Sequence, residues 1–149
     1  MLILTFPVAA AEIVVGPPPE QDGALCDIHF ASGNVMSAIP AAVTPSAQHK
    51  GLSGITAPHE QSMLFWWHSP GFRSFWMHDV SVALDIAFLS ETGKLIQLET
   101  VHPGDTQVYR SKRPVKLVVE QPAGYFASHN VWAGDTLVEI NCEPKNQGS

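Results

Sequence analysis

The sequence predicts a single, mostly β domain of the sandwich or jelly-roll type, with one or two short helices. Three observations predict this class. The chain has 149 residues, a length that suits one domain with its own core. Its strand-like runs are short and closely spaced along the chain. Twelve prolines and eleven glycines provide turns between those runs.

Composition and charge exclude several functional classes. The chain is 45% hydrophobic and carries eight Lys and Arg against fourteen Asp and Glu, which gives a net charge of −6 at pH 7. This composition excludes a disordered chain and, for the chain as a whole, a strongly basic nucleic-acid binder. No apolar run reaches the ~18 residues that a membrane-spanning helix needs. The expected partner is a small molecule or a glycan, and no cofactor is expected, because no Gly-rich phosphate loop is present.

The N-terminal residues predict an export segment followed by a linker. Met1–Ala11 resembles the apolar core and cleavage site of a secretory signal, although it is short and lacks a leading Lys or Arg. A mistaken start or a first strand are the alternatives. Gly16–Pro19 contains three prolines, which lack backbone donors, so we expect a linker there. We therefore expect an export-like segment and linker over residues 1–21, the β-rich domain over 22–143 and a disordered tail over 144–149, in a secreted or periplasmic protein.

The first half of the domain has strand patterns on either side of one helix. Strands are predicted at 24–30 and, after a Gly33-Asn34 turn, at 35–39. A helix is predicted over 46–52, because Thr44 can cap it and Pro45 suits the first helical position. Aromatic-rich runs follow at 63–67 and 72–77.

The second half predicts a hairpin, a short helix and two further strands. Residues 84–89 and 94–101 flank a four-residue loop that ends in Gly93, which is typical of a β-hairpin with a bulge-type loop. A strand at 115–119 precedes one or two helical turns at 123–128. The last strand is predicted at 136–140, after a Gly134-Asp135 turn.

The two cysteines lie in or beside strand-like stretches near opposite ends of the chain. If the strands of Cys26 and Cys142 are neighbours, a disulfide would close a long loop and stabilise the fold by ~4–5 kcal/mol in the chain-entropy model. Two buried free thiols are the alternative. The chain has no Cys-x-x-Cys motif, which excludes a structural zinc site built on cysteine pairs.

An ordered set of motifs resembles one known family. The motifs are Met63-Leu64-Phe65, Phe75-Trp76-Met77, Leu84–Leu89, Tyr109-x-Ser111, Leu117–Glu120, Ala123-Gly124 and Gly134-Asp135. They resemble the bacterial and archaeal family called domain of unknown function 192, over roughly residues 22 to 140. The resemblance implies a compact, mostly β, jelly-roll-like domain that is often exported, and it implies no established activity.

Five residues, at three places in the sequence, depart from the pattern of that family. Ser53 stands where Met is usual, and Ser62 stands where Gly is usual. His78-Asp79-Val80 replaces a usual Lys-Asn-Thr. If this last segment lines a site, the chemistry of that site differs from the chemistry implied by the family pattern.

Aromatic residues are the main candidates for ligand binding. Phe75, Trp76 and Met77 are consecutive, and successive residues of a strand face opposite sides, so the three cannot all face one core. Either both faces are covered, or Trp76 offers a flat platform to a sugar ring or another flat apolar group. Trp66-Trp67 allows the same alternatives. The predicted ligand-binding set is Trp76, Met77, Arg73, Asp85 and Tyr109.

Three carboxylates are candidates for acid–base catalysis. Asp85 and Glu120 lie in apolar strands, and Asp79 follows the aromatic run. Each of the first two is either exposed to solvent or buried and paired, because a buried lone charge is costly. Arg73 and Lys116 are the possible partners for Asp85. Two carboxyls with separated pKa values would permit acid–base chemistry on a carbohydrate, provided that the fold brings them together.

The remaining candidates are a metal site and a basic loop. His78-Asp79 with His102 would form a mixed metal site if two strands bring them together, and ordinary surface histidines are the alternative. The basic residues between 110 and 116 form either a patch for phosphate or carboxylate groups or a solvated loop.

The sequence therefore favours a non-enzymatic binding or accessory domain with an aromatic-rich surface. One alternative is a carboxylate-dependent enzyme with acid–base chemistry, on a carbohydrate for example. The other alternative is a purely structural or interaction domain. Nucleophilic catalysis is not favoured, because the chain has no Gly-x-Ser-x-Gly motif.

Overall fold

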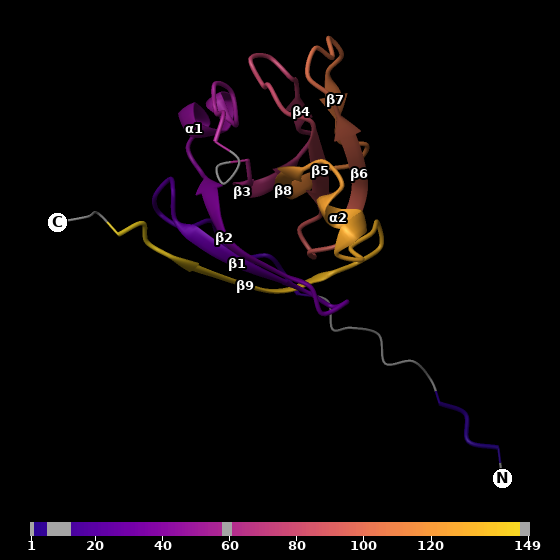
Figure 1. The fold of residues 1–149 in the computed structure, drawn as a ribbon. Coiled ribbons are helices and arrows are strands. Elements are labelled where there is room, and N and C mark those ends of the chain that lie inside the picture. The colour runs from indigo at the N-terminus through magenta and orange to yellow at the C-terminus, as the bar shows by residue number, and fades with distance from the viewer. Residues whose placement is uncertain (1, 6–12, 58–60, 147–149) are drawn as a thin grey trace.

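The predicted class is confirmed, because the protein is mostly β with two short helices. The structure, a computed structural model, describes residues 2–5, 13–57 and 61–146. Figure 1 shows how the elements are arranged. In chain order they are β1 (Leu25–Phe30), β2 (Val35–Ala42), α1 (Pro45–Lys50), β3 (Met63–Gly71), β4 (Ser74–Phe75), β5 (Leu84–Leu89), β6 (Leu95–Val101), β7 (Tyr109–Arg110), β8 (Val115–Pro122), α2 (Tyr125–Ser128) and β9 (Leu137–Glu143).

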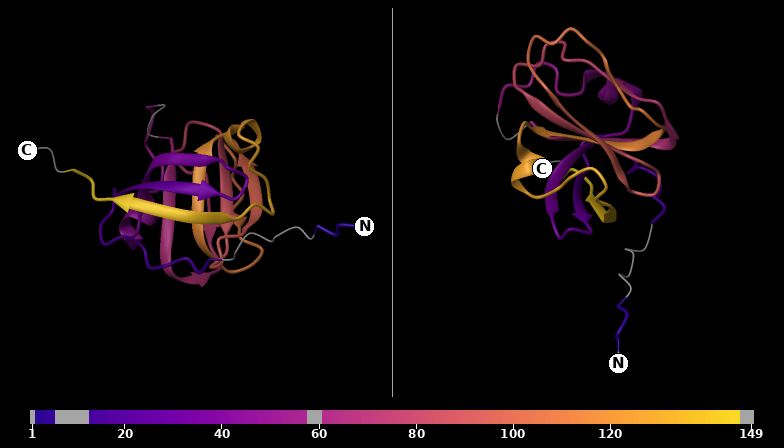
Figure 2. Two further views of the ribbon diagram at one scale, coloured as in Figure 1. Left: turned by 90° about the horizontal axis from the view of Figure 1, so that it is seen from below. Right: turned by 90° about the vertical axis from the view of Figure 1, so that its right-hand side faces the viewer.

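Seven of the strands form one curled sheet in the order β6-β5-β8-β3-β2-β1-β9, and β4 pairs with β7 in a separate two-stranded sheet. Neighbours in the large sheet are antiparallel except β2 and β3, which are parallel. A parallel pair needs a crossover connection, and the segment that carries α1 provides it. The curl brings β2, β1 and β9 across one face of β3, β8 and β5, as the views in Figures 1 and 2 show.

This curl creates a core on each face of the part of the sheet formed by β5, β8 and β3. The inner core lies between the two parts of the sheet and includes Ile28, Leu117 and Val119. The outer core lies on the opposite face and includes Val118. Because side chains alternate along a strand, Glu120 points to the same outer face as Val118. The alternation along β8 therefore decides which face carries this carboxyl.

Local signals in the sequence produce the expected α1 helix and hairpin turn. The Thr44 side chain accepts a hydrogen bond from the Ala47 amide at 3.2 Å, and Pro45 occupies the first position of α1. The β5–β6 hairpin turns at Gly93, whose φ is +81°. A Cβ atom at Gly93 would lie 2.8 Å from the Leu137 carbonyl oxygen. This turn therefore needs glycine both for its backbone conformation and for the close approach of β9.

The chain at the start of the predicted linker packs on the domain. Val15 is 1% exposed, and its amide donates to the Glu91 carbonyl at 2.7 Å. Its carbonyl accepts from the Lys116 Nζ at 2.5 Å. The Gly16 carbonyl accepts from the Trp66 Nε1 at 3.2 Å. Buried backbone groups need partners, and here two side chains of the sheet provide them.

The ends of the domain are joined covalently. Cys26 and Cys142 form a disulfide between directly opposed residues of β1 and β9, with their Cα atoms 4.0 Å apart. Met1 and residues 6–11 of the predicted export segment lie outside the described residues, as do residues 147–149 of the predicted tail. No helix in the described part of the chain has the length and apolarity that crossing a membrane requires.

Candidate functional site

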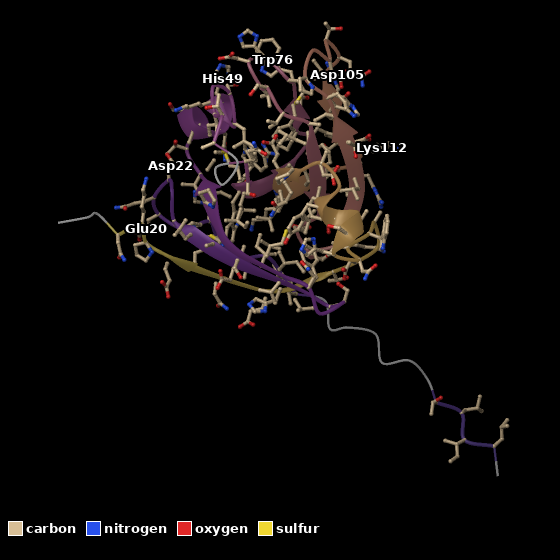
Figure 3. The ribbon with its side chains drawn as sticks, viewed as in Figure 1. Glu20, Asp22, His49, Trp76, Asp105 and Lys112 are labelled. Atoms are coloured by element: carbon tan, nitrogen blue, oxygen red, sulfur yellow. A yellow bond between two sulfur atoms is a disulfide. The ribbon has the colours of Figure 1, made fainter. Side chains whose placement is uncertain are left out.

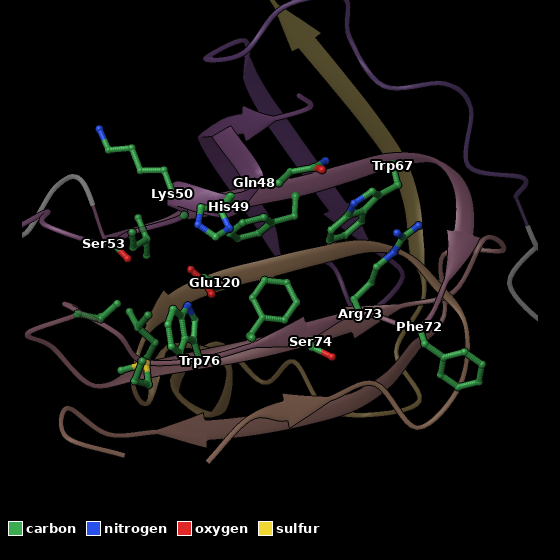
Figure 4. A pocket seen from close by; sticks show the side chains of 17 residues that line it. Gln48, His49, Lys50, Ser53, Trp67, Phe72, Arg73, Ser74, Trp76 and Glu120 are labelled. Carbon is green, nitrogen blue, oxygen red and sulfur yellow. The ribbon is translucent and has the colours of Figure 1, made fainter. Parts of the chain in front are cut away.

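A groove on the outer face of the curled sheet is the candidate functional site. Its volume is about 390 Å³, and it lies between the α1 segment and the chain around β4 (Figure 4). The polar side chains that line it are Gln48, His49, Lys50, Ser53, Arg73, Ser74 and Glu120. Aromatic and apolar side chains complete the lining. A concave site that combines apolar walls with convergent polar groups is suited to holding a ligand.

Interlocking aromatic rings form the walls of the groove. The Phe75 ring packs edge-on against Phe65 at 5.0 Å and against Trp67 at 6.5 Å between ring centroids. Trp76, at the rim, is 57% exposed and stacks on the His78 ring at 4.8 Å (Figures 3 and 4). The structure therefore places Trp76 on the edge of a concave surface, where a flat ligand could stack on it.

The two other neighbouring tryptophans have different roles. Trp66 is buried in the inner core, where its indole donates to the backbone of the N-terminal segment. Trp67 faces the outer side of the same strand and lines the groove. The alternation of β3 therefore assigns one tryptophan to the core and the other to the site.

Glu120 lies on the floor of the groove. Its side chain is 6% exposed, and Figure 4 shows its carboxyl pointing into the space between the α1 segment and β4. Burial raises the pKa of Glu120 to about 8, with no hydrogen bond or neighbouring charge of the described residues contributing to the shift. The carboxyl is therefore mostly uncharged at neutral pH and free to bond with a bound molecule.

Arg73 flanks the groove beside Trp67. Its guanidinium carbon lies 4.3 Å from the centroid of the Trp67 ring, and its Nη2 donates to the Ser69 carbonyl at 2.7 Å. Its Nε is buried and has no hydrogen-bond partner among the described residues. Burial lowers the pKa of Arg73, and no carboxylate of the described residues opposes that shift. Arg73 is thus a positioned cation with unused hydrogen-bonding capacity.

Asp85 belongs to the opposite face of the sheet. On β5 it is paired with Gln121, whereas its neighbour Ile86 is paired with Glu120, so the two carboxyls point to different faces. The Asp85 carboxylate accepts from the Thr100 hydroxyl at 2.7 Å and from the Gly124 amide at 2.9 Å. The structure therefore does not bring Asp85 together with Glu120, and Asp85 joins β5 to β6 and to the start of α2.

Neither predicted cation is the partner of Asp85. Its hydrogen-bond partners are the Thr100 hydroxyl and the Gly124 amide, whereas the Lys116 ammonium donates to the Val15 carbonyl and Arg73 lies in the groove. Hydrogen bonds from Thr100 and from the Gly124 amide therefore compensate for the burial of Asp85, as one of the two expected alternatives, in place of a cation. The carboxylate has a structural role, because buried polar groups are retained where they are bonded.

Met77 and Tyr109 complete the predicted ligand-binding set. Met77 is buried and lines the groove. Tyr109 does not line it, and its hydroxyl donates to Asp105 at 2.5 Å, a bond that raises the pKa of Tyr109. Tyr109 therefore holds the loop between β6 and β7 together.

The predicted metal ligands are not assembled into a site. The Asp79 carbonyl accepts from the Gly54 amide at 2.9 Å, and Asp79 does not line the groove. His78 stacks on Trp76, while His102 lies in the loop between β6 and β7. Among the described residues, no group of three or more His, Cys, Asp or Glu side chains is placed to hold a metal ion.

The sequence analysis missed the polar rim at residues 48–53. The Gln48 side chain donates to backbone carbonyls of β2 and β3 at 3.2 Å each, which fixes α1 over the groove. The Ser53 hydroxyl donates to the His78 carbonyl at 2.9 Å. Ser53 and His78 both depart from the family pattern, and they meet beside the groove. These two departures from the family pattern were the available signal in the sequence for this rim.

Comparisons with known proteins identify related chains. The DUF192 family model, described as Uncharacterized ACR, matches residues 28–138. A protein of unknown function from Novosphingobium aromaticivorans DSM 12444 is 25% identical, with a TM-score of 0.68, over 88% of this chain and 94% of that one. A proposed transcription regulator from Sinorhizobium meliloti 1021 is 26% identical, with a TM-score of 0.66, over 80% of this chain and 92% of that one. No curated protein matches the chain.

Proposed function

The chain belongs to the DUF192 family, and we propose that it is an exported, non-enzymatic domain that binds a small molecule or a glycan. The observation that carries this proposal is the carboxyl of Glu120, whose side chain is only 6% exposed, whose pKa is raised by burial, and which faces an open groove of about 390 Å³. Burial makes a carboxyl costly to ionise, so a glutamate at this position calls for an explanation. A ligand that bonds to Glu120 supplies one.

The walls of the groove support a ligand with a flat apolar face. Trp76 is exposed at the rim, and Phe65, Trp67 and Phe75 form a packed aromatic surface inside. The C–H groups of a sugar ring or the face of an aromatic ring pack well on such surfaces. Because the rings already contact one another, little side-chain ordering is needed on binding.

The disulfide between Cys26 and Cys142 supports export. Disulfides form and persist in the periplasm and outside the cell, whereas cytosolic thiols are kept reduced. The apolar character of Met1–Ala11 agrees with the same location. We therefore propose a secreted or periplasmic protein.

A carboxylate-dependent enzyme is a second candidate, favoured by the pKa of about 8 at Glu120. An acid with a pKa near the working pH is suited to proton transfer. A second carboxyl is absent from the described lining of the groove, so Glu120 would act alone. A nucleic-acid partner is not part of the proposal, because the net charge is −6.

The binding proposal is tested by NMR titration of the protein with a panel of monosaccharides and small aromatic compounds. We expect amide shifts confined to residues that line the groove. Trp76→Ala should weaken the binding, because it removes the exposed ring at the rim. Trp132→Ala is the matched control, since Trp132 is 55% exposed and does not line the groove. Equal effects of the two variants, or shifts outside the groove, would contradict the proposal.

The enzyme candidate makes a different prediction, which is tested with aryl glycosides of the same sugars, because monosaccharides have no glycosidic bond. If Glu120 is a general acid, bound compounds with a glycosidic bond should be cleaved, and Glu120→Gln should abolish the cleavage while leaving binding in place. Analysis of the titrated samples for new products distinguishes the two functions. Unchanged compounds support the binding domain.

A further inference from the structure

The charges that line the groove differ in sign from the charge of the whole chain. The chain carries fourteen acidic residues and a net charge of −6. The described lining of the groove contains one of those acids, Glu120, together with Lys50, Arg73 and His49. Two of these basic residues lie in or beside the last turn of α1, and Arg73 lies next to Trp67. The groove is therefore a local basic surface on an acidic protein.

Arg73 and Glu120 line the same groove without neutralising one another. Burial lowers the pKa of Arg73 and raises the pKa of Glu120. An ion pair between the two would shift both pKa values in the opposite directions. Arg73 bonds to one backbone carbonyl, and its Nε has no partner in the described part of the chain. Glu120 has no hydrogen bond to the described residues that affects its titration. Both groups thus keep bonding capacity in one cavity.

The charge of the ligand decides whether it can bond to both Arg73 and Glu120. A cation would require Glu120 to ionise and would be repelled by Arg73 and Lys50. A neutral ligand would leave the charge of Arg73 unused. An anion pairs with the guanidinium and accepts a hydrogen bond from an uncharged carboxyl, and charge-assisted bonds of this kind are the stronger ones.

We propose that the ligand of the groove is an organic anion, with a carboxylate on a six-membered ring, bound through Arg73 and through a hydrogen bond with the Glu120 carboxyl. The proposal rests on the proposed binding function and names its ligand class. The ring packs against the aromatic wall formed by Phe65, Trp67 and Phe75. Aromatic acids and uronic acids share this chemistry.

Calorimetric titration of the full chain with matched probes tests the ligand charge. Benzoate, benzamide and benzylamine share one ring and differ in charge, and glucuronate and glucose form the corresponding sugar pair. We expect benzoate to bind at least ~tenfold more tightly than benzamide and benzylamine, and glucuronate more tightly than glucose. The tighter of benzoate and glucuronate identifies the source of the carboxylate.

Variants of Arg73 test the anion contact. Arg73→Gln should reduce benzoate affinity ~tenfold and leave benzamide affinity unchanged, whereas Arg73→Lys should keep part of the preference. Arg110→Gln is the matched control, because Arg110 is exposed on β7 and does not line the groove. Unchanged benzoate affinity in folded Arg73→Gln would overturn the proposal.

The pH dependence of benzoate affinity tests the contact with Glu120. Benzoate affinity of the unaltered protein should fall between pH ~6 and ~9, as Glu120 ionises and repels the anion. Glu120→Gln keeps a donor without a titrating charge and should remove most of this fall. His49, Lys50 and Arg73 also line the groove, and His49→Gln separates the contribution of the rim histidine.

Three results would count against the inference. Benzamide or benzylamine binding as tightly as benzoate overturns the anion assignment and leaves the binding function standing. A pH dependence that is the same in Glu120→Gln overturns the role of that carboxyl. Failure of every probe to bind at millimolar concentration contradicts the ligand class, whereas the monosaccharide and aromatic panel decides the binding function separately.

Discussion

At the scale of single residues, two equally buried carboxyls have opposite roles because their partners differ. Asp85 is 4% exposed and Glu120 is 6% exposed. Asp85 accepts hydrogen bonds from Thr100 and from the Gly124 amide, which compensate for its burial. None of the described residues compensates Glu120 in this way, and its pKa rises to about 8. One carboxyl joins strands and the other is left available to a ligand.

This difference predicts a pH dependence of stability that belongs to Glu120. Its pKa is about 8 in the folded protein against a usual 4.5, so between these values the folded chain keeps a proton that the unfolded chain has lost. The free energy of unfolding therefore falls as pH rises through this range, by up to about 1 kcal/mol per pH unit, and the fall ends above the folded pKa. Glu120→Gln should remove this contribution.

Urea unfolding at several pH values between 4.5 and 8 checks the expectation. Glu139→Gln on β9 is the control, because that side chain is exposed and should leave the pH profile as it is. Parallel profiles for the unaltered protein and Glu120→Gln would mean that Glu120 is ionised in the folded state, and they would contradict our account of the groove.

At the scale of secondary structure, the turn between β5 and β6 couples the hairpin to β9. Gly93 has φ +81°, and a Cβ atom there would lie 2.8 Å from the Leu137 carbonyl oxygen. The Gly93 carbonyl also accepts from the Leu137 amide at 2.8 Å. A side chain at this position would therefore strain the turn and displace the last strand.

Gly93→Ala should lower the free energy of unfolding by ~2–4 kcal/mol, from the left-handed backbone together with the clash. Gly33→Ala separates the two effects, because Gly33 has φ +95° and open space around its Cβ position. We expect a loss of only ~1–2 kcal/mol there. Thermal and urea unfolding measure both variants, and equal losses would show that the contact with β9 contributes nothing.

At the scale of the whole molecule, the disulfide joins the first strand of the domain to the last. Cys26 and Cys142 are separated by 116 positions in sequence. The cross-link restricts the unfolded chain, so the double variant Cys26→Ser, Cys142→Ser should lose ~4–5 kcal/mol in the chain-entropy model. Guanidinium unfolding with and without reducing agent measures the loss.

The double variant provides the control for that measurement. Reducing agent should destabilise the unaltered protein and leave the double variant unchanged, because the two cysteines of the chain are then absent. An unaltered protein that is equally stable under both conditions would contradict a disulfide that constrains the unfolded chain.

The sequence predicted the elements of this molecule better than their arrangement. Thr44-Pro45 and Gly93 encode a helix start and a hairpin turn locally, so these could be predicted. The parallel pairing of β2 with β3 and the curl of the sheet depend on contacts between distant segments. Val15, directly before the predicted linker, is held by Lys116, a partner about a hundred positions away.

In the candidate site, too, the residues could be predicted from the sequence better than their arrangement. Trp76, Met77, Arg73 and Glu120 were all predicted as site residues and line one groove. Asp85 was predicted with them, but residue pairing between β5 and β8, which the sequence alone does not specify, places it on the other face. The rim at 48–53 was missed because only the folded chain brings α1 over β8.

The proposed function depends on an uncharged Glu120 at the floor of the groove. The most direct test is carbon-13 NMR of the Glu120 carboxyl across pH, assigned with Glu120→Gln, with and without benzoate. We predict a midpoint near 8 for the free protein, and a higher midpoint with benzoate, because the anion favours the protonated acid. A midpoint near the usual 4.5 that benzoate does not change would contradict the account.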